Sequence, residues 1–294
     1  MSEKEVDLEE PAIVMEMLAL GVELTEEGKH SKAEQLFRKV LEMYEKRLGA
    51  ENSDITLIRC SLAHNLNVQG KYVEAETVLR KAVEVCEKEI GPQHLDIVFI
   101  LNILSFSLDQ QGKYVETEQV MRRMLEIYER ELGPQHLETI TTLNNLSENL
   151  RNQSKHLEAE LLFRKALETY EEELGPNHLH TAIVLNNLGL TLGEQGKYVE
   201  AETLLKRAIE IHEKELGPDH LETAEIMPCL ALSLDRQGKH LEAEHVLRRA
   251  SKIYEKELGP KHPDTVLILT SLAFMLIQQG KDSEAEQIMK RISK

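Results

Sequence analysis

The chain of 294 residues carries 52 acidic and 35 basic residues, a formal net charge of −17. This negative field repels phosphate backbones and anionic lipid headgroups, which argues against nucleic acid and membrane surfaces as partners. No apolar signal segment or bilayer-spanning stretch is visible, and Cys60, Cys86 and Cys229 have neither disulfide nor zinc spacing, so we expect a soluble, cytoplasmic protein with buried reduced thiols.

The sequence is built from an internal repeat. The phrase from Gly70 to Glu76 returns unchanged from Gly196 to Glu202 and nearly unchanged from Gly112 to Glu118, always at multiples of 42 residues. The same register aligns Gly28, Ser154, Gly238 and Gly280. A stack of small units forms a long exposed surface rather than a closed pocket. After an acidic tail at 1–11 we therefore expect a single domain over 12–294, with repeats near 12–53, 54–95, 96–137, 138–179, 180–221, 222–263 and 264–294.

Each repeat predicts two helices. The first helix of the chain is expected at 12–27, after Pro11. In a central repeat, the segment 139–153 carries leucines at spacings of three and four, which indicates one apolar helical stripe. A second helix follows at 157–174, with Ala159, Phe163 and Ala166 among the residues on its buried face. The short turn makes the two helices antiparallel, and glycine at the turn is suited to closing a helix; Ser154 is a weaker stop. We call the two helices of each repeat helix A and helix B.

The link between repeats is a Gly-Pro-x-His motif, in which glycine ends helix B and proline prevents its continuation. Pro263 suits the first position of a helix, which makes His262 the expected N-cap. The equivalent histidines belong to different repeats, about 10 Å apart as helix layers pack, so they cannot share an ion. We expect no metal site and no cofactor.

Two positions depart from the pattern. Pro228 lies inside a predicted helix A, where it removes a backbone hydrogen bond and predicts a kink near Ala224. The final helix, at 283–292, lacks an evident polar cap, so Ile288 and Met289 are expected to leave apolar surface that causes weak self-association or fraying.

Every helix B carries two adjacent bases, which alone would suggest a phosphate-binding ladder. A glutamate always stands four residues before the first base, as Glu76 does before Arg80. This order favours a surface ion pair within the helix, worth about 0.3 kcal/mol. We therefore interpret the stripe as neutralised and not as a nucleic-acid site.

The small-large-small series on helix B, such as Ala75, Leu79 and Ala82, resembles the tetratricopeptide signature. The 42-residue period, the Leu-Asn-Asn-Leu segments at 143–146 and 185–188 and the Leu-Gly-Pro-x-His links are similar to arrays of the kinesin light chain and nephrocystin-3 type. The resemblance implies an all-α fold, a right-handed α-α superhelix (solenoid) of about seven helical hairpins. HEAT and armadillo repeats share the period range but lack this register.

In that family helix A lines the concave face, and the resemblance places a peptide-binding groove at fixed offsets before the turn glycine. Asn102, Asn144 and Asn186 stand ten residues before it, where the amides would hold an extended peptide or, alternatively, bridge neighbouring helices. Asn145 and Asn187 are better placed for such bridges. The other predicted groove residues are Phe99, Phe106, Arg151, Ile183, Leu190, Leu232, Arg236 and Phe274. The apolar ones either pack in the core or line an open binding surface. The positive clusters that grip acidic peptides or terminal carboxylates are missing, so an apolar or amphipathic partner segment is favoured over an acidic tail.

No phosphate-binding glycine loop, nucleophile elbow or zinc-protease motif is present, and we expect no catalytic residues. The favoured function is an adaptor or scaffold that binds a partner protein or peptide on its helix A surface. The alternatives are a structural module that associates through its ends or outer surface, and the recruitment part of a larger signalling complex.

Overall fold

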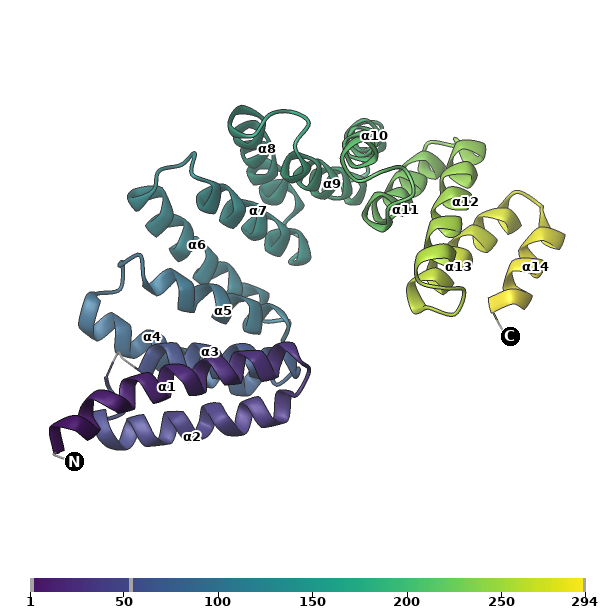
Figure 1. The fold of residues 1–294 in the computed structure, drawn as a ribbon. Helices are drawn as coiled ribbons and strands as arrows, with labels where there is room; N and C mark the ends of the chain where they lie inside the picture. The colour runs from purple at the N-terminus through teal and green to yellow at the C-terminus, as the bar shows by residue number, and fades with distance from the viewer. Residues whose placement is uncertain (1–2, 53–54, 293–294) are drawn as a thin grey trace. The chain divides into compact units, whose positions relative to one another are not determined.

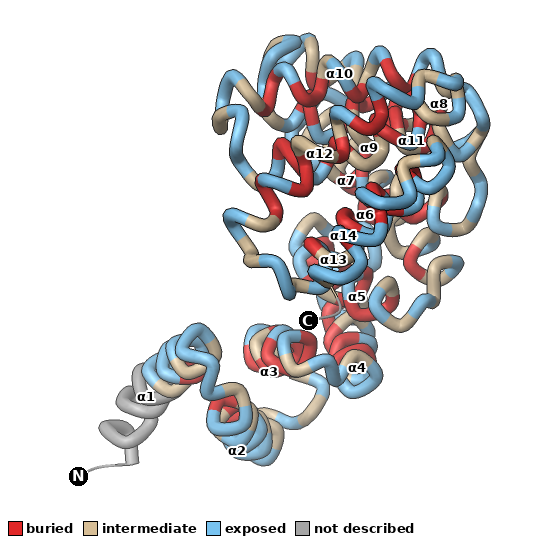
Figure 2. The backbone as a smooth tube through the Cα atoms, turned by 90° about the vertical axis from the view of Figure 1, so that its right-hand side faces the viewer, coloured by how far each residue is buried: buried red, intermediate tan, exposed pale blue. Residues whose placement is uncertain are grey.

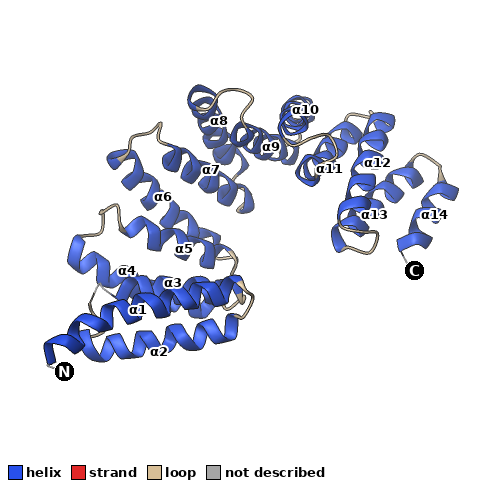
Figure 3. Cartoon of the chain, in the orientation of Figure 1, coloured by secondary structure: helices blue, strands red, loops and turns tan. Residues whose placement is uncertain are grey.

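The computed structural model describes residues 3–52 and 55–292, with side chains described from Met15 onward. Within these ranges all regular secondary structure is helical, as the all-α expectation requires (Figure 3). The chain divides into two compact units, residues 1–149 and 150–294. The single-domain interpretation and the repeat boundaries stay predictions.

The first unit consists of successive antiparallel helix pairs (Figure 1). Its helices are α1 (Glu3–Glu26), α2 (His30–Leu48), α3 (Thr56–Val68), α4 (Tyr72–Ile90), α5 (Ile97–Asp109), α6 (Tyr114–Glu131) and most of α7 (Leu137–Asn152). Besides packing on its neighbours in sequence, α3 also contacts α1 and α5, so these three A helices form a continuous layer.

The second unit has the same construction. Its helices are α8 (His156–Glu173), α9 (Leu179–Glu194), α10 (Tyr198–Glu215), α11 (Leu221–Arg236), α12 (His240–Glu257), α13 (Pro263–Gln278) and α14 (Asp282–Ile292). Here α9 contacts α11 directly. Buried residues alternate with exposed ones along the helices, as expected when each helix buries one side (Figure 2).

The small-large-small series on helix B forms the core of each hairpin. Ala75, Leu79 and Ala82 are completely buried, as are their equivalents around Phe163. The facing position on helix A must be small: a Cβ built on Gly189 would lie 2.8 Å from Cγ of Leu205. In this hairpin α9 and α10 therefore approach each other closely because Gly189, which has no side chain, stands opposite Leu205.

The turn at Ser154 and the cap at His262 have the predicted roles. Ser154 adopts φ 61°, and it is the one non-glycine residue with positive φ in the described part of the chain. His262 caps α13 by accepting a hydrogen bond from the backbone N–H of Asp264. All five link histidines accept a hydrogen bond through Nδ1 from the backbone N–H two residues further on, at 3.1–3.4 Å; they are His94, His136, His178, His220 and His262. The last four stand directly before an A helix and satisfy one of its orphan amides, whereas His94 lies three residues before α5 begins at Ile97.

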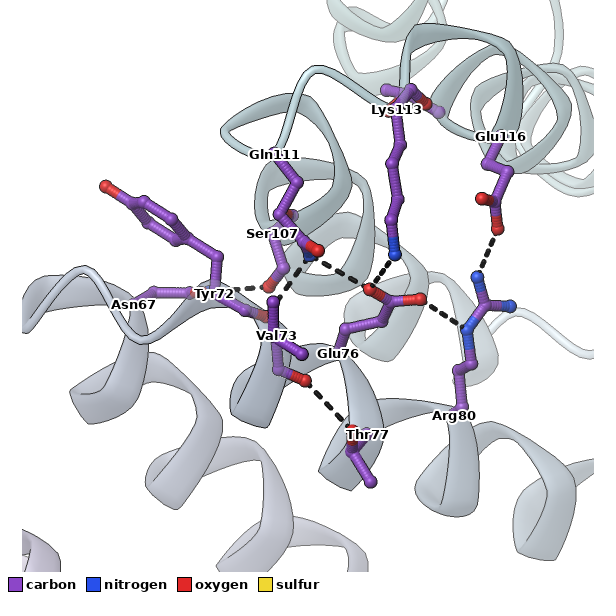
Figure 4. A network of polar contacts seen from close by, with 11 residues as sticks. Asn67, Tyr72, Val73, Glu76, Thr77, Arg80, Ser107, Gln111, Lys113 and Glu116 are labelled. Atoms are coloured by element: carbon purple, nitrogen blue, oxygen red, sulfur yellow. Dashed lines mark hydrogen bonds and ion pairs between the residues drawn. The ribbon is translucent and has the colours of Figure 1, made fainter.

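The glutamate-base pairs of helix B are more than the surface pairs that the sequence predicted. The ion pair between Glu76 and Arg80 forms at 2.8 Å, but the Glu76 carboxylate also accepts hydrogen bonds from Gln111, at 2.9 Å, and Lys113, at 2.6 Å, in the next repeat (Figure 4). Arg80 reaches Glu116 of that repeat as well. The i,i+4 spacing could not predict these bonds because the two partners of each lie more than thirty residues apart in the sequence.

This inter-repeat bridge recurs. Glu34 receives Arg38, Gln69 and Lys71; Glu160 receives Arg164, Gln195 and Lys197; Glu202 receives Lys206, Gln237 and Lys239. Burial by itself would raise the pKa of Glu76, but the bonds from Lys113, Arg80 and Gln111 outweigh it and lower the pKa to about 2. The bridge is therefore a structural ion-pair network that joins successive hairpins.

Two details differ from the sequence-based expectations, and a third stays a prediction. Helix α1 begins at Glu3, ahead of Pro11, so much of the segment interpreted as a tail is helical. Helix α11 is continuous across Pro228, and the kink near Ala224 stays a prediction. Ile288 is buried with 7% exposure, so the expected apolar end surface is reduced there, although Met289 is exposed.

Candidate functional site

Helix A presents a stripe of exposed apolar side chains in each unit. Phe99 and Phe106 on α5 lie seven residues apart, two helical turns, and are 59% and 50% exposed, whereas Leu101, Leu104 and Leu108 of the same helix are buried. The apolar positions predicted on α5 are therefore surface, not core. Large apolar groups exposed together in this way are typical of an interaction site.

In the first unit this stripe borders a pocket of about 260 Å³ between α1, α3 and α5. Its lining residues are Val22, Thr25, Glu26, Phe37, Leu57, Cys60, Ser61, His64, Phe99 and Ile103. Phe37 and Cys60 are buried and form the floor, while Leu57 and Phe99 are exposed at the rim. Among the groove residues named above, Phe99 belongs to this pocket.

The pocket floor is chemically inert. Burial raises the pKa of the Cys60 thiol to about 12, so the side chain is a neutral, mostly apolar group. Beyond the pocket, Phe106 makes an edge-on ring contact with Tyr72 at 6.3 Å, which fixes the neighbouring part of the stripe.

The three predicted asparagines are placed differently. Asn102 is exposed, Asn144 is buried and Asn186 is half-buried. The buried amide oxygens of Asn144 and Asn186 have no hydrogen-bond partner within the described residues. An amide with spare bonding capacity suits a peptide backbone. The clamp stays a prediction for all three asparagines.

Bridges between A helices are made by other asparagines. The amide nitrogen of Asn65 donates to Thr25 at 2.8 Å, and Asn67 accepts from Ser107 at 2.9 Å. Asn145, which was expected to bridge, receives a long contact of 3.4 Å from Asn144 of its own helix. Asn65 and Asn67 were missed although both lie on the face of α3 toward its neighbours.

In the second unit, the predicted apolar residues Ile183, Leu232 and Phe274 are exposed and Leu190 is half-buried. Leu267 and Ile277 of α13 join the exposed set.

The two predicted arginines differ in setting. Arg151 bonds to Glu194 at 3.0 Å, while Arg236 is exposed on α11. Glu194 also faces His156 at 3.2 Å. Arg151 is thus tied to an acid of the same unit, which makes it a weak site for an acidic ligand.

Two further kinds of feature are relevant in the described ranges, metal-ligand clusters and membrane-spanning helices. No group of three or more His, Cys, Asp or Glu residues there is arranged to hold a metal ion. No helix among those residues combines the length and apolar character needed to cross a bilayer.

Models of known protein families match most of this chain. A family model described as tetratricopeptide repeat covers residues 99–172, 145–214, 180–255 and 226–294, and a second model with the same description covers 17–54 and 57–96. No curated protein matches the sequence.

Solved structures share the fold. BtubC (BKLC) from P. vanneervenii is 22% identical with a TM-score of 0.63, over 85% of this chain and 94% of that one. A putative kinesin light chain with TPR-like repeats from Podospora anserina is 20% identical with a TM-score of 0.60, over 69% and 96%. A signal transduction ATPase with a tetratricopeptide repeat sensor from Pyrococcus horikoshii is 14% identical with a TM-score of 0.71, over 94% and 41%. Kinesin light chain-like repeat proteins are thus among the structural neighbours.

Proposed function

Because this chain belongs to the tetratricopeptide-repeat family, we propose that it is a non-catalytic adaptor that binds a partner protein through the exposed apolar stripe of its A helices. The observation that carries the proposal is the exposure of Phe99 and Phe106 beside a preformed pocket. A stable soluble surface seldom leaves large apolar groups next to a hollow unless something covers them. The partner segment would be apolar or amphipathic, and the site of action cytoplasmic.

The test is partner capture from the native extract with matched variants. We expect the double variant Phe99→Ala and Phe106→Ala to lose the partner, because each truncation removes apolar surface that the complex would bury. The control is Val73→Ala with Val115→Ala in helices α4 and α6 of the same unit, whose side chains are 66% and 61% exposed. Loss in both double variants, or in neither, would contradict the proposal.

A second candidate function is assembly through the outer surface. Leu157 and Leu161 stand one helical turn apart on α8 and are 77% and 67% exposed, without a place in the helix A stripe. If they mediate self-association, light scattering over a dilution series will show a concentration-dependent mass that Leu157→Ser with Leu161→Ser removes. A constant monomeric mass at high concentration would exclude it.

A further inference from the structure

We infer that the pocket of the first unit receives one bulky apolar side chain from a cationic amphipathic segment of the partner protein. This rests on the proposed function and adds the partner's chemistry. It differs from the acidic ligands associated with related cargo-binding repeats.

The size of the pocket favours a side chain over a small-molecule ligand. Its 260 Å³ lies below the roughly 300–1,000 Å³ of typical ligand sites. A cavity of about 150 Å³ lined by apolar groups already holds benzene, so this pocket accommodates a leucine- or phenylalanine-sized group. Phe37, Cys60 and Ile103 supply an apolar interior, and Leu57 and Phe99 extend it outward.

The charged side chains exposed on the three A helices that border the pocket have one sign. On the described parts of α1, α3 and α5 the exposed or half-buried charged side chains are Glu16, Glu23, Glu26 and Asp109. The one lysine or arginine on these stretches is Arg59. Its side chain is buried and forms an ion pair with Glu45 at 2.8 Å. Besides these acids and Arg59, the titratable side chains on the same stretches are Cys60 and His64, and both line the pocket.

The ends of the helices strengthen this field. Consecutive helices are antiparallel, so α1, α3 and α5 run in the same direction and bring their C-terminal ends to one side of the unit. None of the three has a base in its last turn, whereas Glu26 and Asp109 stand there. A helix C-terminus carries a partial negative charge, which adds to these carboxylates.

Nearby lysines do not cancel the field at the pocket. Lys29, Lys71 and Lys113 follow the turns, and each is bonded to a glutamate: Glu27, Glu34 and Glu76 respectively. Complementary charges steer encounter and select partners. A partner with lysine or arginine beside its apolar anchor therefore fits this surface, and one with flanking acids is repelled.

The test uses two synthetic fluorescent peptides, each an 18-residue amphipathic helix with the same leucine face. One has lysines on its polar face and the other has glutamates. Fluorescence anisotropy with the full chain should give a dissociation constant at least about tenfold lower for the lysine peptide, and added salt should weaken that binding.

Two protein variants locate the binding. Ser61→Trp fills the pocket and should weaken the lysine peptide about tenfold or more, because burial of the leucine anchor is lost. Phe99→Ala removes part of the pocket rim and should also weaken binding of the lysine peptide. It serves as the test if circular dichroism shows that Ser61→Trp does not fold.

Glu26→Lys tests the charge argument and should weaken the lysine peptide about 3- to 10-fold. Glu89→Lys is its control: Glu89 is exposed on α4, so the variant changes the net charge equally but away from the pocket, and binding should stay as in the wild type. Equal or tighter binding of the glutamate peptide would overturn the cationic partner. Lysine-peptide binding unchanged by both Ser61→Trp and Phe99→Ala would overturn the pocket. Either result leaves partner capture by Phe99 and Phe106 as a separate test of the adaptor.

Discussion

Replacing Glu76 with glutamine should loosen the contact between two successive repeats. The substitution keeps the shape of the side chain but removes the charge that receives Arg80, Gln111 and Lys113. Because a glutamine amide has only one oxygen, its NH₂ group must face one of these donors. The change therefore removes one charged bond outright and weakens another.

The loss of stability expected for Glu76→Gln depends on how exposed the bonded side chains are. The Glu76 side chain is 10% exposed, but Arg80 and Lys113 are 49% and 38% exposed, so each ion pair is partly screened by water. We therefore take about 1 kcal/mol for each of two affected bonds, between the values for surface pairs and for bonds to buried charges. A loss of about 2 kcal/mol in the free energy of unfolding corresponds to a fall of about 4–8 °C in Tm for a unit of this size.

The pH dependence identifies the cause. The folded pKa of Glu76, about 2, lies below its ordinary value of 4.5. The carboxylate thus stabilises the fold above pH 4.5, and this contribution is lost as the pH falls from 4.5 toward 2. Thermal melts followed by circular dichroism should show Glu76→Gln less stable than the wild type at pH 7, with the gap closing toward pH 2. Glu116→Gln, which removes only the exposed partner of Arg80, should give a smaller shift. An unchanged Tm at pH 7, or a gap that persists at pH 2, would refute the bridge.

Two further predictions concern the helices. His262→Ala should cost about 1 kcal/mol of stability because the Asp264 amide loses its acceptor, whereas His262→Asn should retain the cap; equal urea midpoints for the two variants would contradict this role. Gly189→Val should destabilise the fold by about 1–3 kcal/mol, because even a Cβ at this position would lie 2.8 Å from Leu205. Gly193→Ala should be neutral or stabilising, because its Cβ would lie 3.7 Å from Ser233. Thermal melts that reverse this order would contradict the close approach of the two helices.

The sequence predicted the hairpins well because their determinants repeat with the chain. Ala75, Leu79 and Ala82 mark a buried helix face at any position in the array, and Pro263 identified His262 as a cap before the geometry was known. These features depend on residues within one turn of each other. Local sequence therefore contains the information they need.

The pocket and the inter-repeat bridge could not be predicted from local sequence in the same way. Phe37, Cys60 and Ile103 belong to different hairpins, and whether they enclose space depends on how closely α1, α3 and α5 pack. The bonds from Gln111 and Lys113 to Glu76 require the next repeat to be placed in three dimensions. A Gln-Gly-Lys turn stands at the same distance after five of these glutamates, Glu34, Glu76, Glu160, Glu202 and Glu244, and this regular spacing was a signal that could have suggested the bridge.

The most direct test of the adaptor proposal is site-specific photo-crosslinking. A photoreactive phenylalanine analogue is placed singly at positions 99 and 106 on α5, and at 73 and 115 on α4 and α6, all exposed in the same unit. In the native extract, we predict one crosslinked partner from positions 99 and 106 and none from 73 and 115. Crosslinks formed only from positions 73 and 115 would contradict binding through the A helices.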